Sequence, residues 1–145
     1  KGHEFSAGRI TYLFDGQHLW YALPSGRILC YPYARLEAGE ITYAKASWKP
    51  AADASEWPRA RLWRGLACEN VTQATANDIL RHALRQLEME GEQIVLHVHD
   101  EAVAETADPI ATTERMRRVM TTPPAWAQDL PLNIEISTMS RYGKG

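Results

Sequence analysis

The feature that most constrains this chain is a short apolar run that meets two acidic residues. Residues 93–98 read Gln-Ile-Val-Leu-His-Val, His99-Asp100-Glu101 follow, and a second apolar run, Ala-Val-Ala, begins at once. Two such runs around a short polar break predict a β-hairpin with the acidic residues at its apex. Carboxylates beside strands are costly to bury unless a cation or hydrogen-bond donors compensate them. The pattern therefore suggests a divalent metal site, with Asp100 projecting into open space.

The acidic pair favours a hard cation over zinc. Mg²⁺ prefers carboxylate oxygens and keeps several waters, so Asp100, with Glu101 nearby, would suffice once substrate phosphates complete the shell. A zinc or manganese hydrolase built on His97 and His99 would need a third ligand, and no His or Cys follows His99 in the chain. A plain polar turn between two strands is the remaining reading of the same residues.

The whole pattern predicts an α+β fold, in which an antiparallel sheet with a central hairpin packs against one long and one shorter helix. Apolar residues recur at helical spacing between Ala76 and Leu87, and Asp108-Pro109 has the form of a helix N-cap followed by proline. We expect a single domain of 145 residues. Its predicted parts are a β meander at 9–47, an irregular connection at 48–65, a helix at 66–90, the hairpin at 93–105, a helix at 108–121 and a strand at 132–138.

Composition narrows the class of protein. The formal net charge of −2 gives no basic field over the whole chain, which counts against an autonomous nucleic-acid binder but allows a local basic strip. Cys30 and Cys68 lie in different segments, which indicates reduced thiols in a cytoplasm rather than a disulfide or zinc framework. No run reaches transmembrane length and no signal peptide is visible, so we expect a cytoplasmic protein with no membrane partner.

Polar residues on the predicted long helix form a second candidate feature. Asn70, Gln73 and Asn77 are three and four residues apart, so uncharged amides share one face. Amides that donate and accept suit the minor groove of a duplex, although a solvated helix face would look the same. The arginines of the shorter helix, at 115, 117 and 118, and the tail residue Arg141 could likewise contact phosphates or simply face solvent.

These residues together resemble a known family. Val98-His99-Asp100-Glu101 resembles the third conserved palm motif of family A DNA polymerases, the DNA polymerase I group. Residues 69–80 are similar to the palm helix of that family, in which a Gln and a small residue precede Ala-x-Asp-Ile. Residues 23–32 and 120–132 resemble the bacteriophage branch. The resemblance runs from about residue 9 to the end of the chain.

The resemblance implies roles for four residues. Asp100 matches the metal-binding aspartate, Glu101 the neighbouring acid with a less direct role, His99 the histidine near the primer terminus, and Gln73 the glutamine that reaches the minor groove. It also implies Mg²⁺ as the cofactor rather than zinc, and primer–template DNA and dNTP as partners of a full-length parent in a bacterial host cell. Two Mg²⁺ ions would stabilise the attacking and leaving oxygens of nucleotidyl transfer.

The chain departs from the family in two ways. It has no motif like Asp-Tyr-Ser-x-Ile-Glu, which carries the second metal-binding aspartate, and Asp15, in a predicted turn, is no substitute. It also lacks the fingers helix that grips the nucleotide. We therefore expect a C-terminal part of a phage-type polymerase that is inactive alone and binds Mg²⁺ weakly. A cloned domain, a proteolytic product and a prophage remnant stay open, as does a non-catalytic duplex-binding module.

Overall fold

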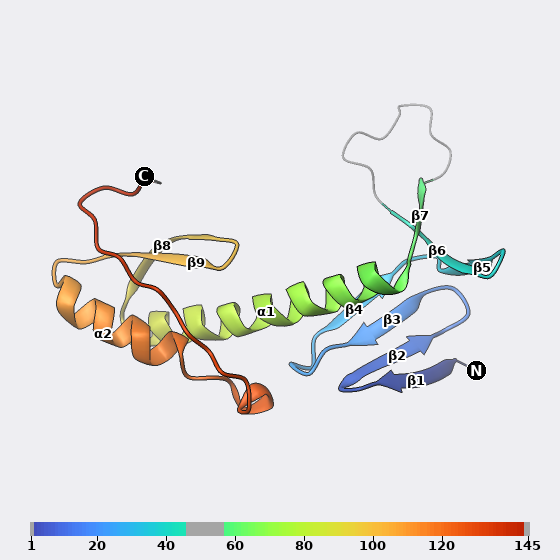
Figure 1. Cartoon of the computed structure of the whole chain (residues 1–145), viewed down its shortest axis with the longest axis horizontal. Coiled ribbons are helices and arrows are strands. Elements are labelled where there is room, and N and C mark those ends of the chain that lie inside the picture. The colour runs from blue at the N-terminus through green and yellow to red at the C-terminus, as the bar shows by residue number, and fades with distance from the viewer. Residues whose placement is uncertain (1, 46–56, 144–145) are drawn as a thin grey trace. The chain divides into compact units, whose positions relative to one another are not determined.

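Residues 2–45 and 57–143 are described by the computed structural model and form three separate antiparallel sheets with two α-helices and one 3-10 turn (Figure 1). The α+β class predicted from the sequence is confirmed. The strands are β1 (His3–Ala7), β2 (Ile10–Phe14), β3 (Leu19–Ala22), β4 (Ile28–Tyr31), β5 (Arg35–Glu37), β6 (Glu40–Ala44), β7 (Arg59–Arg61), β8 (Gln93–Val98) and β9 (Glu101–Glu105). The helices are α1 (Arg64–Met89), α2 (Pro109–Met120) and the 3-10 turn η1 (Ala125–Ala127).

The chain divides into two compact units, residues 1–75 and 76–145, where we expected one domain. Each unit has its own cluster of buried side chains. The helix α1 begins in the first unit and ends in the second.

The first unit is built around a four-stranded sheet in the order β1-β2-β3-β4. Alternate residues point to opposite faces of a strand, and one face of this sheet carries the aromatic residues Tyr12, Tyr21 and Tyr31. Tyr21 and Tyr31 are buried, and the first turns of α1 pack against the same cluster through Leu66 and Val71. The sheet and the helix therefore share one aromatic core.

The predicted meander at 9–47 is wrong in its extent and pairing. Residues 35–44 leave the first sheet and form a second one, in the order β5-β6-β7. The strand β1 was not predicted, because all five of its residues are exposed and their polar character hides the strand pattern. Part of the predicted irregular connection, 48–56, lies outside the described residues; β7 follows it at Arg59–Arg61.

The long helix α1 ends where the sequence predicts. Gly91 has a φ of +86°, which a residue without a Cβ adopts at little cost. The backbone N–H of Glu92 then donates to the carbonyl of Leu87, at 3.0 Å, and so caps the last turn. This reversal directs the chain into β8.

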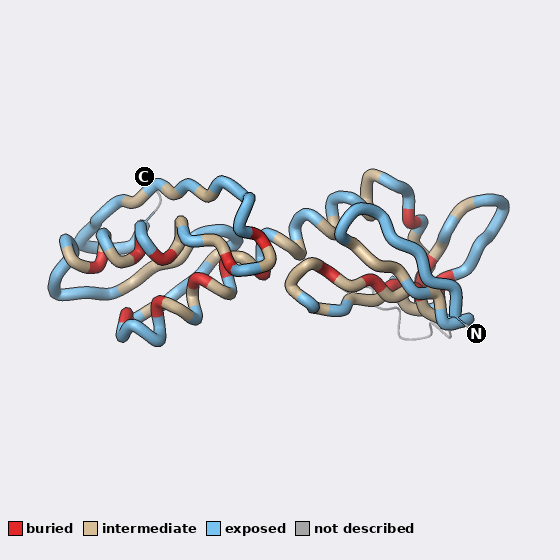
Figure 2. The backbone as a smooth tube through the Cα atoms, turned by 90° about the horizontal axis from the view of Figure 1, so that it is seen from below, coloured by how far each residue is buried: buried red, intermediate tan, exposed pale blue. Residues whose placement is uncertain are grey.

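The second unit packs the hairpin β8–β9 and the helix α2 on the end of α1. Leu87 is fully buried, and Ala83, Met116 and Val119 complete the cluster. Buried residues recur along the helices at helical spacing (Figure 2). The predicted N-cap is confirmed, because the side chain of Asp108 accepts a hydrogen bond from the N–H of Ala111 at 3.1 Å.

The predicted strand at 132–138 is wrong. These residues alternate between partly buried and exposed positions, as a strand on a core would, but no strand is formed there. Ile136 packs against the cluster of the second unit. Alternating apolar residues indicate only that an extended segment buries one of its faces. A strand also needs a neighbouring strand for its backbone hydrogen bonds. In this unit, β8 and β9 pair with each other.

Candidate functional site

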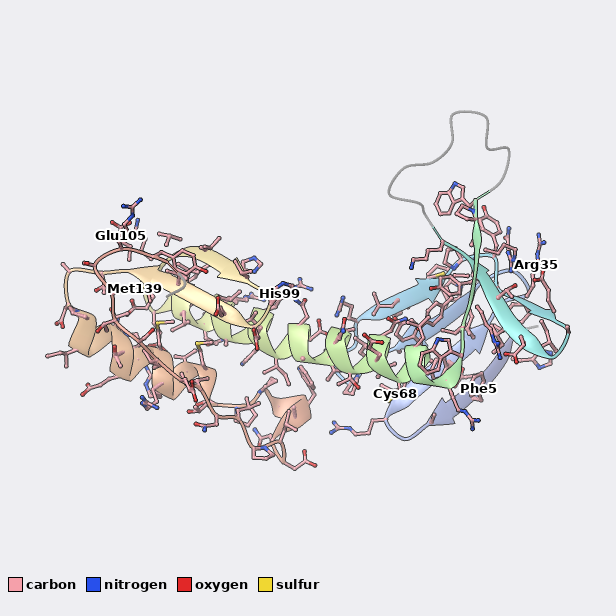
Figure 3. The ribbon with its side chains drawn as sticks, turned by 45° about the horizontal axis from the view of Figure 1, so that its top comes forward. Phe5, Arg35, Cys68, His99, Glu105 and Met139 are labelled. Atoms are coloured by element: carbon pink, nitrogen blue, oxygen red, sulfur yellow. The ribbon has the colours of Figure 1, made fainter. Side chains whose placement is uncertain are left out.

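The His-Asp-Glu segment forms the tight turn that the sequence predicts. Val98 pairs with Glu101, so only His99 and Asp100 lie between the two strands. His99 has a φ of +53°; Figure 3 labels it beside the hairpin. A side chain other than glycine in this region is sterically unfavourable, and such residues concentrate at functional sites. The turn therefore carries local strain next to the candidate acid.

Asp100 is exposed at this turn. Within residues 2–45 and 57–143 its carboxylate accepts no hydrogen bond and forms no ion pair. Glu101 is also exposed, and the hydroxyl of Tyr142 lies 3.5 Å from its Oε2 atom. This contact could not be predicted from the sequence, because 41 residues separate the two side chains.

The base of the hairpin is held by a buried carboxylate that sequence reasoning missed. Glu92, immediately before β8, is 7% exposed. Its Oε2 atom accepts a hydrogen bond from the Thr112 hydroxyl at 3.0 Å, and its Oε1 atom forms an ion pair with Arg115. A buried charge needs such partners. The position of Glu92 directly after Gly91, which ends α1, was the one feature of the sequence that could have indicated this role.

Two of the arginines considered as phosphate contacts are engaged inside this unit. Arg115 pairs with Glu92, and Arg118 forms a two-pronged ion pair with Glu90. The hydrogen bond from Arg118 lowers the pKa of Glu90, and the same contact raises the pKa of Arg118. Arg117, between them, is exposed. The basic face of α2 is thus largely neutralised by α2's own neighbours.

The amide stripe of α1 is divided between two roles. The Nδ2 atom of Asn70 donates to the hydroxyl of buried Tyr31 at 3.0 Å, which ties the helix to the aromatic core. Gln73 and Asn77 are exposed, and the Nε2 atom of Gln73 donates to Glu69 at 3.1 Å. Gln73 is therefore accessible, but it belongs to the first unit, whereas His99, Asp100 and Glu101 belong to the second.

Asp15 occupies the turn between β2 and β3, and its carboxylate is fully used there. It accepts hydrogen bonds from the N–H groups of His18 (2.7 Å) and Gln17 (2.8 Å) and from the indole N–H of Trp20 (2.8 Å). These donors, that of His18 first, lower the pKa of Asp15 to about 2. Asp15 is a turn residue, as the sequence indicates.

The described residues contain no preassembled cluster of metal-ligating side chains, either around His97 and His99 or around Asp100. The alternative on His97 and His99 needs a third ligand, and within 2–45 and 57–143 no three His, Cys, Asp or Glu side chains are grouped so as to hold a metal ion. In the same parts of the chain, no helix combines the length and apolar character that crossing a bilayer requires.

Comparison with known proteins places this chain beside a viral enzyme. It is 33% identical over 136 residues to a protein described as DNA polymerase from Bacillus phage SP02. The aligned region covers 93% of this chain and 21% of the phage protein, so the chain spans about a fifth of the length of that relative. No protein-family model matches the chain, and no solved structure does. The chain is therefore similar to one region of a phage DNA polymerase.

Proposed function

We propose that this chain is a palm region of a phage-type family A DNA polymerase. The observation that carries the proposal is the match to a phage DNA polymerase over nearly the whole chain. The exposed carboxylate of Asp100 at a two-residue turn supports it, because the turn fits the His-Asp-Glu motif that the sequence resembles. The substrates of the parent enzyme would be primer–template DNA and dNTP.

In this proposal, Asp100 is the principal protein ligand of Mg²⁺. Its free oxygens fit a hard cation that keeps most of its waters and completes its shell with substrate phosphates. When bound, the metal would neutralise charge on the phosphoryl group during transfer. Glu101 would support the site as the neighbouring acid, His99 would lie near the primer terminus, and Gln73 would read the minor groove of the duplex.

The 145-residue chain alone is proposed to be inactive. Two-metal catalysis needs ligands that hold both ions, and the motif that carries the second metal-binding aspartate of the family does not occur in this sequence. The chain also has no counterpart of the fingers helix described for the family. Template-directed primer extension by the purified chain would contradict this part of the proposal.

Titration with Mn²⁺, followed by the electron paramagnetic resonance of the free ion, tests the metal site. We expect weak binding, with a Kd on the order of 1 mM, as is typical of sites with few protein ligands. Asp100→Ala should abolish it. Asp15→Asn is the matched control, since that carboxylate is occupied by three donors of its own turn, and it should bind as wild type does. Equal binding by Asp100→Ala removes the metal site.

A non-catalytic duplex-binding module is the second candidate, favoured by the exposed amides of Gln73 and Asn77. Binding of a fluorescent primer–template duplex should then fall steeply with salt. Binding that needs no metal, survives Asp100→Ala and is weakened by Gln73→Ala would favour this module over the polymerase palm.

A further inference from the structure

Aromatic rings form a continuous stack across the first sheet. The ring of Phe5 on β1 stacks on Tyr12 at 4.9 Å with an interplanar angle of 8°. The ring centroids of Tyr12 and Tyr21 are 5.9 Å apart with an interplanar angle of 28°. Those of Tyr21 and Tyr31 are 5.1 Å apart with an interplanar angle of 20°. These spacings are close to the separation of neighbouring strands, so each strand adds one ring to the stack.

The two ends of the stack differ. At the inner end, Tyr31 is 5% exposed and meets Tyr43 edge-on at 5.0 Å. Burial also raises the pKa of Tyr12 and of Tyr21. At the outer end, Phe5 is 53% exposed, on a strand whose five residues are all exposed. Among the described strands, none pairs with the outer edge of β1 (Figure 3). The stack therefore ends in an open aromatic face.

The two strands beside this face carry no carboxylate on it. Register places His3, Phe5 and Ala7 on the face that carries Tyr12, and places Glu4 on the opposite face, opposite Leu13. The β2 residues on the Phe5 face, Ile10, Tyr12 and Phe14, are apolar or aromatic. β1 and β2 therefore present no carboxylate on the side where a ligand would stack.

We propose that Phe5 is a stacking site for an unpaired base of single-stranded DNA. A base is flat, so it can continue the row Tyr21, Tyr12, Phe5 by one further member, and its phosphates meet no carboxylate of β1 or β2 on this face. Inside a duplex each base is covered on both faces by its stacked neighbours, whereas an unpaired base can turn a face to such an edge, which separates this site from the duplex contact assigned to Gln73. Because its ligand is DNA, this site rests on the proposed function and extends it to a single-stranded segment.

A second kind of ligand fits the same edge less well. An extended peptide could add a strand beside β1 and place an aromatic residue opposite Phe5. Such a strand would be held mainly by main-chain hydrogen bonds to β1, and it would make little use of the row of parallel rings that ends at Phe5. A base needs only the ring face, which is the group that the structure leaves open.

Binding of the 145-residue chain to a short fluorescein-labelled oligo(dA) strand, measured by anisotropy, tests the proposal. Phe5→Ala should weaken binding by about 5- to 100-fold, the range found for removal of one stacking ring. Phe5→Trp should retain binding. Phe5→Leu should lose it at an unchanged thermal midpoint, because leucine keeps apolar contact with Tyr12 but has no flat face. Leu36→Ala, at a 75% exposed position on β5, is the control and should bind as wild type does.

Photo-crosslinking with a 5-iodouracil-containing strand supplies a direct readout, and the adduct should map to Phe5. Equal anisotropy curves for wild type and Phe5→Ala, or no binding by either, would overturn the proposal. So would concentration-dependent self-association that Phe5→Ala removes without any crosslink to DNA, since the edge would then take a protein strand. The Mn²⁺ titration does not involve Phe5, so it separates failure of this site from failure of the proposed function.

Discussion

Two aspartates at the reversals of antiparallel hairpins have opposite surroundings in this protein. Asp15, between β2 and β3, accepts three hydrogen bonds from its own turn, and its pKa falls to about 2. Asp100, between β8 and β9, accepts none within the described parts of the chain and is exposed. One carboxylate stabilises its turn, and the other makes no hydrogen bond or ion pair in the described residues. The residue type and the kind of turn are therefore not enough to assign function.

The two turns also differ in the type of residue that takes a positive φ. The first turn places Gly16 at a φ of +101°, where a glycine fits without steric cost. The second places His99 at a φ of +53°. A turn that served only to reverse the chain could use glycine there. The second turn keeps an imidazole in this region, but Tyr33 and Ala38 have similar φ values of +50° and +51°, so the conformation of His99 does not by itself assign a function.

The two turns are also secured by different means, and the largest predicted effect tests this difference. Among the described residues, the carboxylate of Asp100 accepts no hydrogen bond within the β8–β9 turn. The base of this hairpin is instead joined to α2 through Glu92. Arg115→Met should lower the free energy of unfolding by about 3 kcal/mol, because it leaves a buried carboxylate without its cation. Urea denaturation followed by circular dichroism measures the change.

Arg117→Met is the matched control for that experiment. Arg117 lies on the same helix and is exposed, so its loss should change stability by no more than about 0.5 kcal/mol. Equal effects of the two substitutions would show that the Glu92 anchor contributes little and would weaken the contrast between the turns.

The next effect concerns the pH dependence that Asp15 contributes. Its pKa is lowered from 3.8 to about 2 on folding, so the ionised carboxylate stabilises the fold above about pH 4, and this contribution is lost as the pH falls from about 4 to about 2. Asp15→Asn should therefore have a lower thermal midpoint than wild type at pH 7, and the difference should shrink towards pH 2.

Thermal scans at several pH values check this prediction. Asp100→Asn removes a carboxylate that holds nothing in the described residues, and its midpoint should lie near that of wild type at pH 7. A difference between wild type and Asp15→Asn that is the same at pH 7 and pH 2 would mean that the hydrogen bonds to Asp15 do not depend on its charge.

Sequence reasoning succeeded where local signals and tertiary packing agree. The helix α1, the hairpin and the capped start of α2 follow from apolar periodicity, from Gly91 and from Asp108-Pro109, and all three are present. It failed where the formation of a strand depends on pairing with another strand. The edge strand β1 has no buried face of its own to read, and the segment 132–138 has a strand-like pattern but forms no strand.

The candidate site was predictable only in part, for the same reason. The turn and the exposure of Asp100 follow from neighbours in the sequence. The contact of Tyr142 with Glu101 and the ion pair of Arg115 with Glu92 join residues 41 and 23 positions apart. No local pattern encodes such distant partners. The assignment of Gln73 and Asp100 to one catalytic site stays a prediction that rests on the resemblance.

The smallest effect bears most directly on why His99 occupies its position. His99→Gly should stabilise the protein by about 0.5–1 kcal/mol, because relief of about 1–2 kcal/mol of steric cost at positive φ exceeds the added freedom of the unfolded chain. His97→Gly, two residues earlier in strand β8, where His97 pairs with Ala102, should instead destabilise it by about 0.5–1 kcal/mol. Opposite signs in urea denaturation would show that the histidine at the turn is kept against the interest of stability. Destabilisation by both substitutions would mean that the imidazole of His99 is held by packing, and the contrast with Gly16 would then carry no information about function.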